Sequence, residues 1–184
     1  MAIRREIAPL RQGELDCLCA VYAAINAARL LLSAHGAPLS LAESSRVYAS
    51  STERLARKGA LHEALTWGVE QRRQFAIARH VAALVSSDRF SVSVERPAHA
   101  KWGVDHAFNW IEESLTASKP VMIRLIGAAG LDHFTVVSAC TATTLHLFDS
   151  GPRRYIRKDS IGLRKGTNVI PASSMMRLAL EPLG

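Results

Sequence analysis

Hydrophobic positions follow a helical period over the first two thirds of the chain. The stretch Cys19–Leu32 is rich in Ala and Leu and is apolar on nearly all sides, a pattern typical of a helix buried in a core. Asp16 precedes this stretch, where a carboxylate can accept hydrogen bonds from the free N–H groups of a first helical turn. We therefore expect a central helix that begins between Leu15 and Leu18. Both early cysteines then lie in or near its first turn.

Two further regions complete the first two thirds of the chain. From residue 39 to about 85, apolar residues recur at helical spacing and Gly59 and Gly68 interrupt the pattern, so we expect two or three short helices. The stretch 90–95 alternates apolar and polar residues as a β-strand does, and 104–115 has the pattern of an amphipathic helix.

The pattern changes at Pro120. Short β-rich runs follow at 121–126, 133–140, 144–149 and 154–157, separated by Gly, Ala, Thr and Ser-Gly-Pro turns. A last run at 170–180 has no convincing helix cap and favours a closing strand. The simplest topology is an antiparallel meander. Helices first and strands afterwards predict an α+β fold, in which the buried central helix packs on one face of a C-terminal antiparallel sheet.

Length and composition set the scale of this fold. With 184 residues, 48% of them hydrophobic, the chain can bury one sizeable core but is short for two full domains. We expect one domain over 1–184, with a mainly helical part at 1–118 and a β part at 119–184. No apolar run has the length of a signal peptide or a membrane span. This predicts a soluble, cytoplasmic protein with no membrane partner, and leaves its oligomeric state open.

The net charge of +7 decides little about partners. Basic residues are scattered, apart from one mild cluster (Arg153, Arg154, Arg157, Lys158, Arg164 and Lys165). No phosphate-binding loop and no aromatic RNA-binding motif accompanies them, so a solvated basic face is favoured over a nucleic-acid site.

Three cysteines make an odd number and no disulfide framework. Cys17 and Cys19 are separated by one residue, which does not match the spacing of zinc ligands, and no second cysteine pair exists. We therefore expect reduced thiols, no metal and no cofactor. Cys140 lies within an apolar strand and is expected to be an inert packing residue.

The early cysteines, His133 and Asp149 form a candidate constellation. A thiol becomes a nucleophile when a helix N-terminus and a neighbouring imidazolium favour its thiolate, and a third group must orient the imidazole. His133 opens one strand after a small-residue loop, and Asp149 ends the next. If a turn at 141–143 joins these strands, His133 and Asp149 fall at the same end of the hairpin.

These residues carry a resemblance to a known family. The segment 11–27 (RQGELDCLCAVYAAINA), together with 132–137 (DHFTVV) and 145–150 (LHLFDS), is similar to papain-like cysteine peptidases, in particular the bacterial C39-like branch that includes the bacteriocin-processing domains of exporters. In that family a Gln ahead of the nucleophile helps form the oxyanion hole. The resemblance implies a papain-like fold, Gln12 as oxyanion donor, His133 as base and Asp149 as the orienting acid.

The resemblance leaves two candidates for the nucleophile. The family usually places five residues between the Gln and the Cys, whereas Cys17 leaves four and Cys19 leaves six. The preceding Asp16 favours Cys17, and the small Ala20 favours Cys19. A position inside the first helical turn gains most from the helix N-terminus, so we favour Cys19 and keep Cys17 as its rival.

The function expected from these residues is a cysteine-dependent hydrolase that acts on a peptide or protein substrate. The same residues would serve a deamidase or an acyltransferase, because all three pass through an acyl-enzyme. A catalytically silent binding module with a basic surface is the alternative from another class. Trp67, Trp102 and Trp110 are expected in the core or the cleft, with Trp102 or Trp110 as a groove residue.

Overall fold

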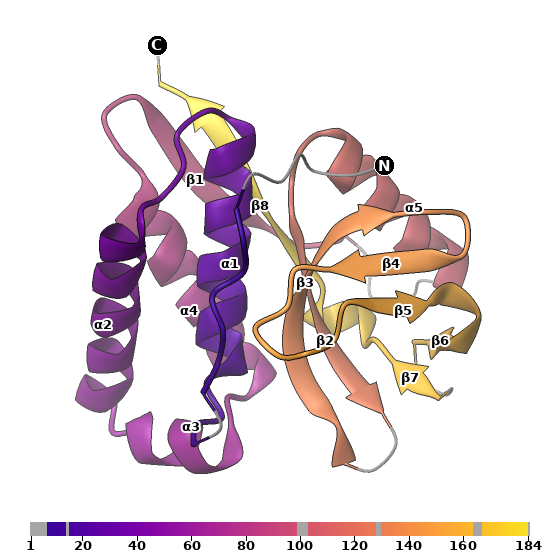
Figure 1. The fold of residues 1–184 in the computed structure, drawn as a ribbon, viewed down its shortest axis with the longest axis horizontal. Helices are drawn as coiled ribbons and strands as arrows, with labels where there is room; N and C mark the ends of the chain where they lie inside the picture. The colour runs from indigo at the N-terminus through magenta and orange to yellow at the C-terminus, as the bar shows by residue number, and fades with distance from the viewer. Residues whose placement is uncertain (1–6, 14, 99–102, 128–129, 164–166, 184) are drawn as a thin grey trace.

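The first helix is the element around which the rest of the chain is arranged. The computed structural model describes residues 7–13, 15–98, 103–127, 130–163 and 167–183. Within them, α1 (Cys19–Ala34) stands between helices α2 (Leu41–Arg57) and α4 (Gln71–Val85) on one side and the sheet on the other, as Figure 1 shows. The chain therefore forms the mixed helix-and-sheet structure with an antiparallel sheet that its pattern predicts.

Helix α1 begins at the late end of the range expected for it. Leu18 is the N-cap and Cys19 is the first helical residue. Asp16 lies just ahead, and its Oδ1 accepts a hydrogen bond from the Leu18 N–H at 2.9 Å. The carboxylate thus satisfies one of the backbone donors that a helix start leaves without a partner.

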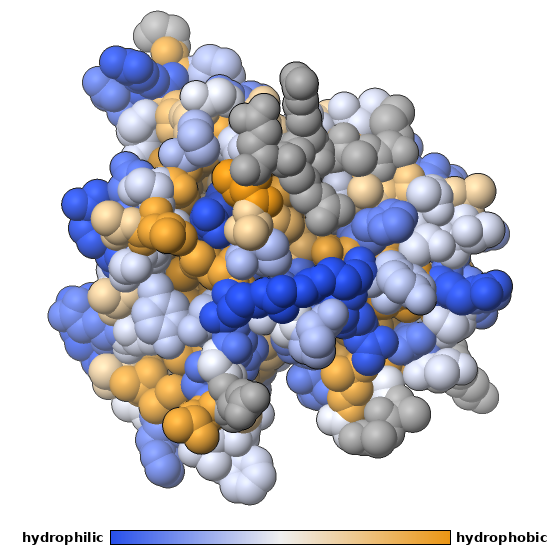
Figure 2. Space-filling view, in the orientation of Figure 1, coloured by the Kyte–Doolittle hydropathy of each residue, from blue (hydrophilic) through white to orange (hydrophobic). Residues whose placement is uncertain are grey.

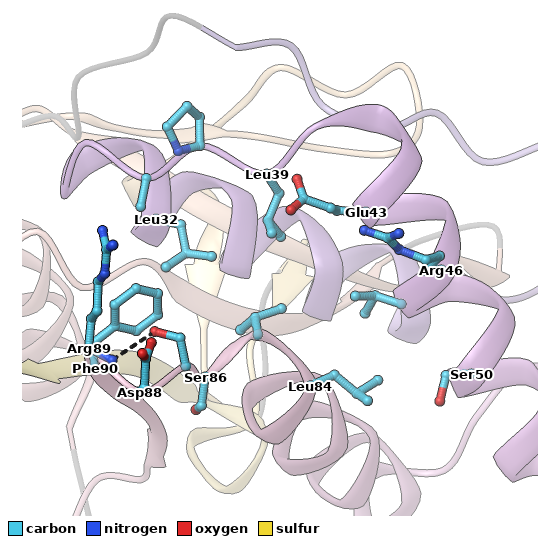
Figure 3. Close-up of a pocket in the computed structure, with 15 residues that line it drawn as sticks. Leu32, Leu39, Glu43, Arg46, Ser50, Leu84, Ser86, Asp88, Arg89 and Phe90 are labelled. Atoms are coloured by element: carbon cyan, nitrogen blue, oxygen red, sulfur yellow. Dashed lines mark hydrogen bonds between the residues drawn. The ribbon is translucent and has the colours of Figure 1, made fainter. Parts of the chain in front are cut away.

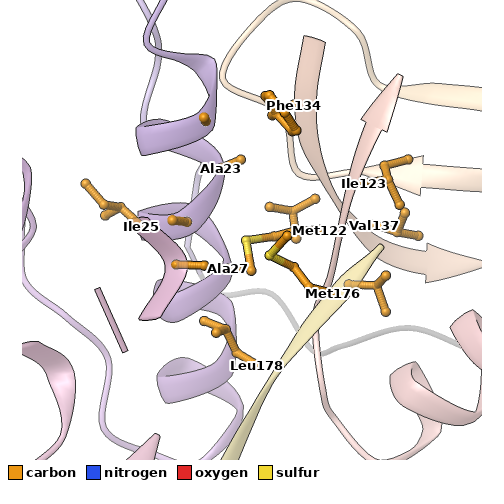
Figure 4. Close-up of a cluster of buried hydrophobic side chains, with 14 of the residues drawn as sticks. Ala23, Ile25, Ala27, Met122, Ile123, Phe134, Val137, Met176 and Leu178 are labelled. Atoms are coloured by element: carbon orange, nitrogen blue, oxygen red, sulfur yellow. The ribbon is translucent and has the colours of Figure 1, made fainter. Parts of the chain in front are cut away.

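Small side chains on α1 allow it to approach the sheet closely. Ala23 and Ala27 are almost fully buried and face Met122 and Met176 on the strands, as Figure 4 shows. Close packing of this kind tolerates little change in volume. The alanines therefore fix the distance between the helix and the strands behind it.

The stretch 39–85 forms three helices, the upper end of the expected number. α3 (Leu61–Trp67) follows α2 and precedes α4 along the chain. Gly59 and Gly68 separate the three helices with φ of 66° and 86°, in the left-handed region that favours glycine. The expected strand and amphipathic helix follow as β1 (Phe90–Glu95) and α5 (Val104–Thr116).

The order of the strands in the sheet differs from that of the simple meander expected from the sequence. Its remaining strands are β2 (Val121–Gly127), β3 (Asp132–Cys140), β4 (Thr144–Leu147), β5 (Tyr155–Arg157), β6 (Ile161–Gly162), β7 (Asn168–Val169) and β8 (Met176–Pro182). Strands β2 to β5 do form an antiparallel meander, but β8 returns between β1 and β2 to give the order β1-β8-β2-β3-β4-β5. The short β7 pairs with β2 and, in parallel, with β6.

The predicted closing strand is also shorter than its apolar run. Residues 170–175 contain a 3-10 turn, η3 (Ala172–Ser174), and the strand proper starts at Met176. A second 3-10 turn, η2 (Lys158–Ser160), follows β5. Among the residues that the structure describes, no helix is both long enough and apolar enough to cross a membrane.

The close packing of α1 can be tested by enlarging one of its alanines. We expect Ala27→Leu to lower the free energy of unfolding by about 1–3 kcal/mol, because overpacking a dense core forces neighbouring side chains from their preferred positions. Ala56→Leu, at an exposed position of α2, is the matched control and should change stability little. Urea unfolding followed by circular dichroism measures both. Equal stability of the two variants would contradict this packing.

Candidate functional site

The Cys19 side chain lies where the start of α1 meets the start of β3. It is only 7% exposed, and its Sγ accepts a hydrogen bond from the backbone N–H of Phe134 at 3.5 Å. It also interacts with the side chain of His133. A backbone N–H and an imidazole therefore both lie beside this one sulfur.

His133 and Asp149 form a close, largely buried pair. His133 Nε2 lies 2.6 Å from Asp149 Oδ1, and the two side chains are 18% and 1% exposed. Because Nε2 faces the carboxylate, Nδ1 is the ring nitrogen left for Cys19. The structure therefore brings together three of the residues singled out in the sequence, in the order thiol, imidazole, carboxylate.

The charges of this cluster stabilise one another. Burial disfavours the imidazolium, but the hydrogen bonds and charges of Asp149 and Cys19 outweigh that effect and raise the pKa of His133 to about 10. Burial likewise opposes ionisation of Asp149, yet its bond to His133 and the backbone N–H of Gly151 lower the pKa of this carboxyl. At neutral pH the pair is therefore an imidazolium beside a carboxylate.

A β-bulge gives Asp149 its place beside His133. Strands β3 and β4 pair as expected through the turn at 141–143, but their register shifts by one residue around Ser138. Beyond the bulge the Phe148 N–H donates to Val136 O, so Asp149 lies across from Thr135. Side chains alternate between the faces of a strand, and Thr135 shares a face with His133. If the register next to the turn continued without this shift, Asp149 would lie across from Val136, on the other face.

Gln12 is held near the cluster by the N-terminal segment. Its backbone N–H donates to Ser150 O at 3.0 Å, next to Asp149, and its side-chain Nε2 donates to Asp16 O at 2.5 Å. It lines the same cavity as Cys19 and His133. Gln12 is thus hydrogen-bonded both to the loop that follows Asp149 and to the residues that precede α1.

Two polar residues of α1 anchor this segment, a role that the apolar pattern of the helix did not predict. The Asn26 side chain accepts from the Leu10 N–H at 2.8 Å and donates to the Leu10 carbonyl at 3.2 Å. The Arg29 guanidinium donates to Ala8 O at 2.7 Å. Both side chains are buried, and the segment runs along α1 in Figure 1. An Asn and an Arg in an otherwise apolar helix were the available signal, because buried polar groups need partners.

Cys17 has different partners. Its Sγ donates to Thr66 O at 3.4 Å, and its backbone N–H donates to Leu65 O, both on α3. The side chain is half-buried. Cys17 and Cys19 therefore point to different walls, and Cys19 is the cysteine that contacts the imidazole.

Both thiols open into one cavity of about 350 Å³. Figure 2 shows a notch in the surface between the helical part and the sheet, at the end of the molecule where α3 lies. One wall is α3 and its connection to α4, and the other is the start of β3 with Arg124 of β2. The lining residues are Gln12, Cys17, Cys19, Glu63, Trp67, Gly68, Val69, Glu70, Arg124, Asp132, His133 and Phe134.

Two of the tryptophans lie in the core or the cleft, as expected, but the one at the cleft is not the one expected there. Trp67 lies at the rim of this cavity and is 83% exposed, so of the two places expected for it, the core and the cleft, it occupies the cleft. Trp110 is partly buried against the core with the Arg177 guanidinium over its ring and does not line the cavity. Trp102 lies outside the described residues. A helix of seven residues has too little amphipathic pattern to show which side faces solvent.

An ion pair on the sheet wall was also missed. The Arg124 guanidinium binds both carboxylate oxygens of Asp132, with Nε to Oδ1 at 2.7 Å, and lies over the Phe134 ring. The hydrogen bond to Asp132 raises the pKa of Arg124, and the charge of Cys19 makes a smaller contribution in the same direction. Cross-strand pairs depend on register, which the sequence alone did not fix.

The third thiol is not in purely apolar surroundings. Cys140 is buried, which raises its pKa, and its Sγ lies 3.5 Å from Glu112 Oε1. Lys158 binds that carboxylate at 2.7 Å, and Arg157 pairs with Asp159. Two members of the basic cluster are thus partly neutralised, and two others, Arg164 and Lys165, lie outside the described residues.

A larger cavity, of about 800 Å³, lies at the other end of α1. Leu32, Leu39 and Leu84 contribute to its apolar lining, and Arg46 and Asp88 to its polar lining (Figure 3). It holds no cysteine and no histidine, so its size alone does not suggest a reaction. Within the described part of the chain, no three His, Cys, Asp or Glu side chains gather as a metal site would require.

Fold and site together define an α+β protein with a buried Cys–His–Asp cluster that opens into a cleft between helices and sheet. No protein-family model matches the sequence, and no curated protein is significantly similar to it. The case for a function therefore depends on the residues themselves.

The coupling within the cluster can be tested at the carboxylate. We expect Asp149→Asn to lower the pKa of His133 from about 10, because the imidazolium loses its negatively charged partner. Asp132→Asn is the matched control, since Asp132 binds Arg124 instead. NMR titration of the imidazole signals measures the pKa in all three proteins. The pairing is refuted if the pKa of His133 is the same in Asp149→Asn as in the unaltered protein.

Proposed function

We propose that this protein is a cysteine hydrolase of the papain-like, C39-like kind that acts on peptide bonds, with Cys19 as nucleophile. The observation that carries the proposal is the arrangement of Cys19, His133 and Asp149 at the floor of an open cleft. A buried imidazole bonded to a carboxylate on one side and to a thiol on the other has the geometry that nucleophilic catalysis requires.

The first half of the reaction forms an acyl-enzyme. The Cys19 thiolate attacks the carbonyl carbon of the substrate, and a new C–S bond forms as the carbonyl oxygen takes up negative charge. The His133 imidazolium then donates its proton to the leaving amine, and the C–N bond breaks. Asp149 keeps the ring oriented and stabilises its positive charge.

Two donors are available for the negatively charged oxygen. The backbone N–H of Cys19 belongs to the first turn of α1, whose N–H groups have no partner within the helix. The Gln12 amide has two hydrogens, and the bond to Asp16 O leaves one of them for the substrate. Donors fixed before the reaction stabilise a developing oxyanion most effectively.

The second half of the reaction determines the product. Neutral His133 accepts a proton from water, the hydroxide attacks the thioester, and Cys19 leaves as a thiolate. An amine in place of water would make the protein an acyltransferase, and a side-chain amide as substrate would make it a deamidase. The open cleft, with an aromatic side chain on each wall (Trp67 and Phe134), suits an extended peptide and favours hydrolysis of a peptide bond.

Reactivity of the thiols provides the first test. We expect iodoacetamide to label Cys19 faster than Cys140, because His133 favours the nucleophilic thiolate and Cys140 is buried beside Glu112. His133→Ala should slow labelling at Cys19 severalfold. Cys17→Ala, the matched control, should leave it nearly unchanged. Peptide mapping by mass spectrometry gives the rates, and labelling at Cys19 that is slow and insensitive to His133→Ala would end the proposal.

Turnover provides the second test. A peptide library incubated with the protein should yield cleavage products that are absent with Cys19→Ala. We expect Gln12→Ala to reduce kcat about 100-fold to 1,000-fold, as the loss of one oxyanion donor does in other enzymes, with a smaller effect on KM. Gln71→Ala, on the exposed start of α4, controls for loss of an amide elsewhere. Products with an unbroken peptide bond and a new acid or amide would indicate a deamidase or acyltransferase.

A further inference from the structure

The second thiol of the cleft has no part in the reaction above. Cys17 lines the same cavity as Cys19 and is separated from it by Leu18 alone. It is half-buried, whereas Cys19 is buried. Solutes that enter this cavity therefore meet two sulfurs. The sulfur of Cys19 contacts an imidazole, and the sulfur of Cys17 does not.

The backbone between the two cysteines suits a bond between them. Leu18 has φ of −84° and ψ of 27°, a turn-like conformation that draws its neighbours together compared with an extended chain. A disulfide needs Cα atoms about 4.4–6.8 Å apart, and a turn at the middle residue places two cysteines of this spacing within that range. The Cα separation therefore permits a disulfide. Because the two sulfurs point to different walls, the Cys17 side chain must rotate away from α3 for them to meet.

The side chain of Cys17 is only weakly tethered. Its thiol makes one hydrogen bond, to Thr66 O at 3.4 Å, and a thiol is a weak donor. Cys17 precedes the N-cap of α1, so the first turn of the helix does not restrict its side chain. Rotation about its Cα–Cβ bond costs one weak hydrogen bond, and the Thr66 carbonyl is at an exposed position that water reaches.

We propose that Cys17 is a resolving thiol, which captures Cys19 after its oxidation by a hydroperoxide and forms a reversible Cys17–Cys19 disulfide that closes the site. The inference builds on the proposed function, because it needs a nucleophilic thiolate at Cys19. It adds a second role for the cleft, as a place where a small oxidant is sensed.

The reaction balances in two steps. The Cys19 thiolate attacks one oxygen of the hydroperoxide, an S–O bond forms as the O–O bond breaks, and the alkoxide or hydroxide that leaves takes up a proton. Cys19 is then a sulfenic acid. The Cys17 sulfur attacks the Cys19 sulfur, its proton combines with the departing hydroxide as water, and the S–S bond forms. The two sulfurs are oxidised by two electrons in total, and the hydroperoxide is reduced by two.

The disulfide protects Cys19 from further oxidation and is easily reduced. Without a second thiol nearby, a sulfenic acid proceeds to the irreversible sulfinic acid. A ring closed by cysteines only one residue apart is strained, and strain makes a disulfide easier to reduce. A small thiol reductant therefore restores the nucleophile by thiol–disulfide exchange.

The sequence offers a convenient readout. Trypsin cleaves after Arg11 and Arg29, so one peptide, 12–29, contains Cys17 and Cys19 but not Cys140. After treatment of the full-length protein with hydrogen peroxide, we expect mass spectrometry without reduction to find that peptide lighter by two hydrogen atoms. Iodoacetamide labelling of Cys19 should disappear in parallel and return after dithiothreitol.

Variants distinguish a failure of the resolving role of Cys17 from a failure of the proposed hydrolase function. In Cys17→Ser, peptide 12–29 should instead gain oxygen atoms, and dithiothreitol should not restore labelling once the sulfinic acid has formed. Cys140→Ser is the matched control and should still form the disulfide. If Cys19 reacts readily with iodoacetamide but the peptide gains oxygen in the unaltered protein as in Cys17→Ser, the resolving role is refuted and the hydrolase remains. If Cys19 reacts with neither reagent, the hydrolase fails as well.

Discussion

The structure depends on the close contact between the small-residue face of α1 and the sheet. Ala23 and Ala27 let the helix lie against the strands, and this contact fixes where the helix begins relative to the start of β3. As a result the Cys19 sulfur meets the Phe134 N–H and the His133 ring. Bulkier residues on that face would separate the thiol from the imidazole even if both elements formed. Apolar packing thus determines a polar contact.

Hydrogen bonds from inside the core position the rest of the site. Asn26 and Arg29 lie within the apolar helix but direct their polar atoms to the backbone at Leu10 and Ala8. That segment carries Gln12 to the loop after Asp149. The same helix therefore places the nucleophile through its first turn and the amide of Gln12 through two buried side chains farther along. A buried polar group lacking a partner is costly, which gives the segment one preferred path.

Local patterns in the sequence were sufficient for most elements and for the pairing of His133 with Asp149. Apolar spacing located α1 and the strand runs, and the expected turn at 141–143 formed. The position of β8 between β1 and β2 was not predictable, because strand order depends on contacts between distant segments. The spacing of Cys17 and Cys19 from Gln12 left both open as the nucleophile. Only the three-dimensional arrangement shows that Cys17 faces α3 and Cys19 faces the histidine.

The bulge at Ser138 gives the hairpin two independent properties. Its backbone ladder continues on either side of the extra residue, so the strand pairing does not require the bulge. What the bulge sets is the face of His133 and Asp149 relative to the side chains next to the turn. Deletion of Ser138 would close the register and leave Asp149 across from Thr135, but one half of the hairpin would then exchange its faces relative to the other half. The extra residue therefore lets one hairpin direct its charged pair to the cleft while Leu145 and Cys140, next to the turn, stay buried.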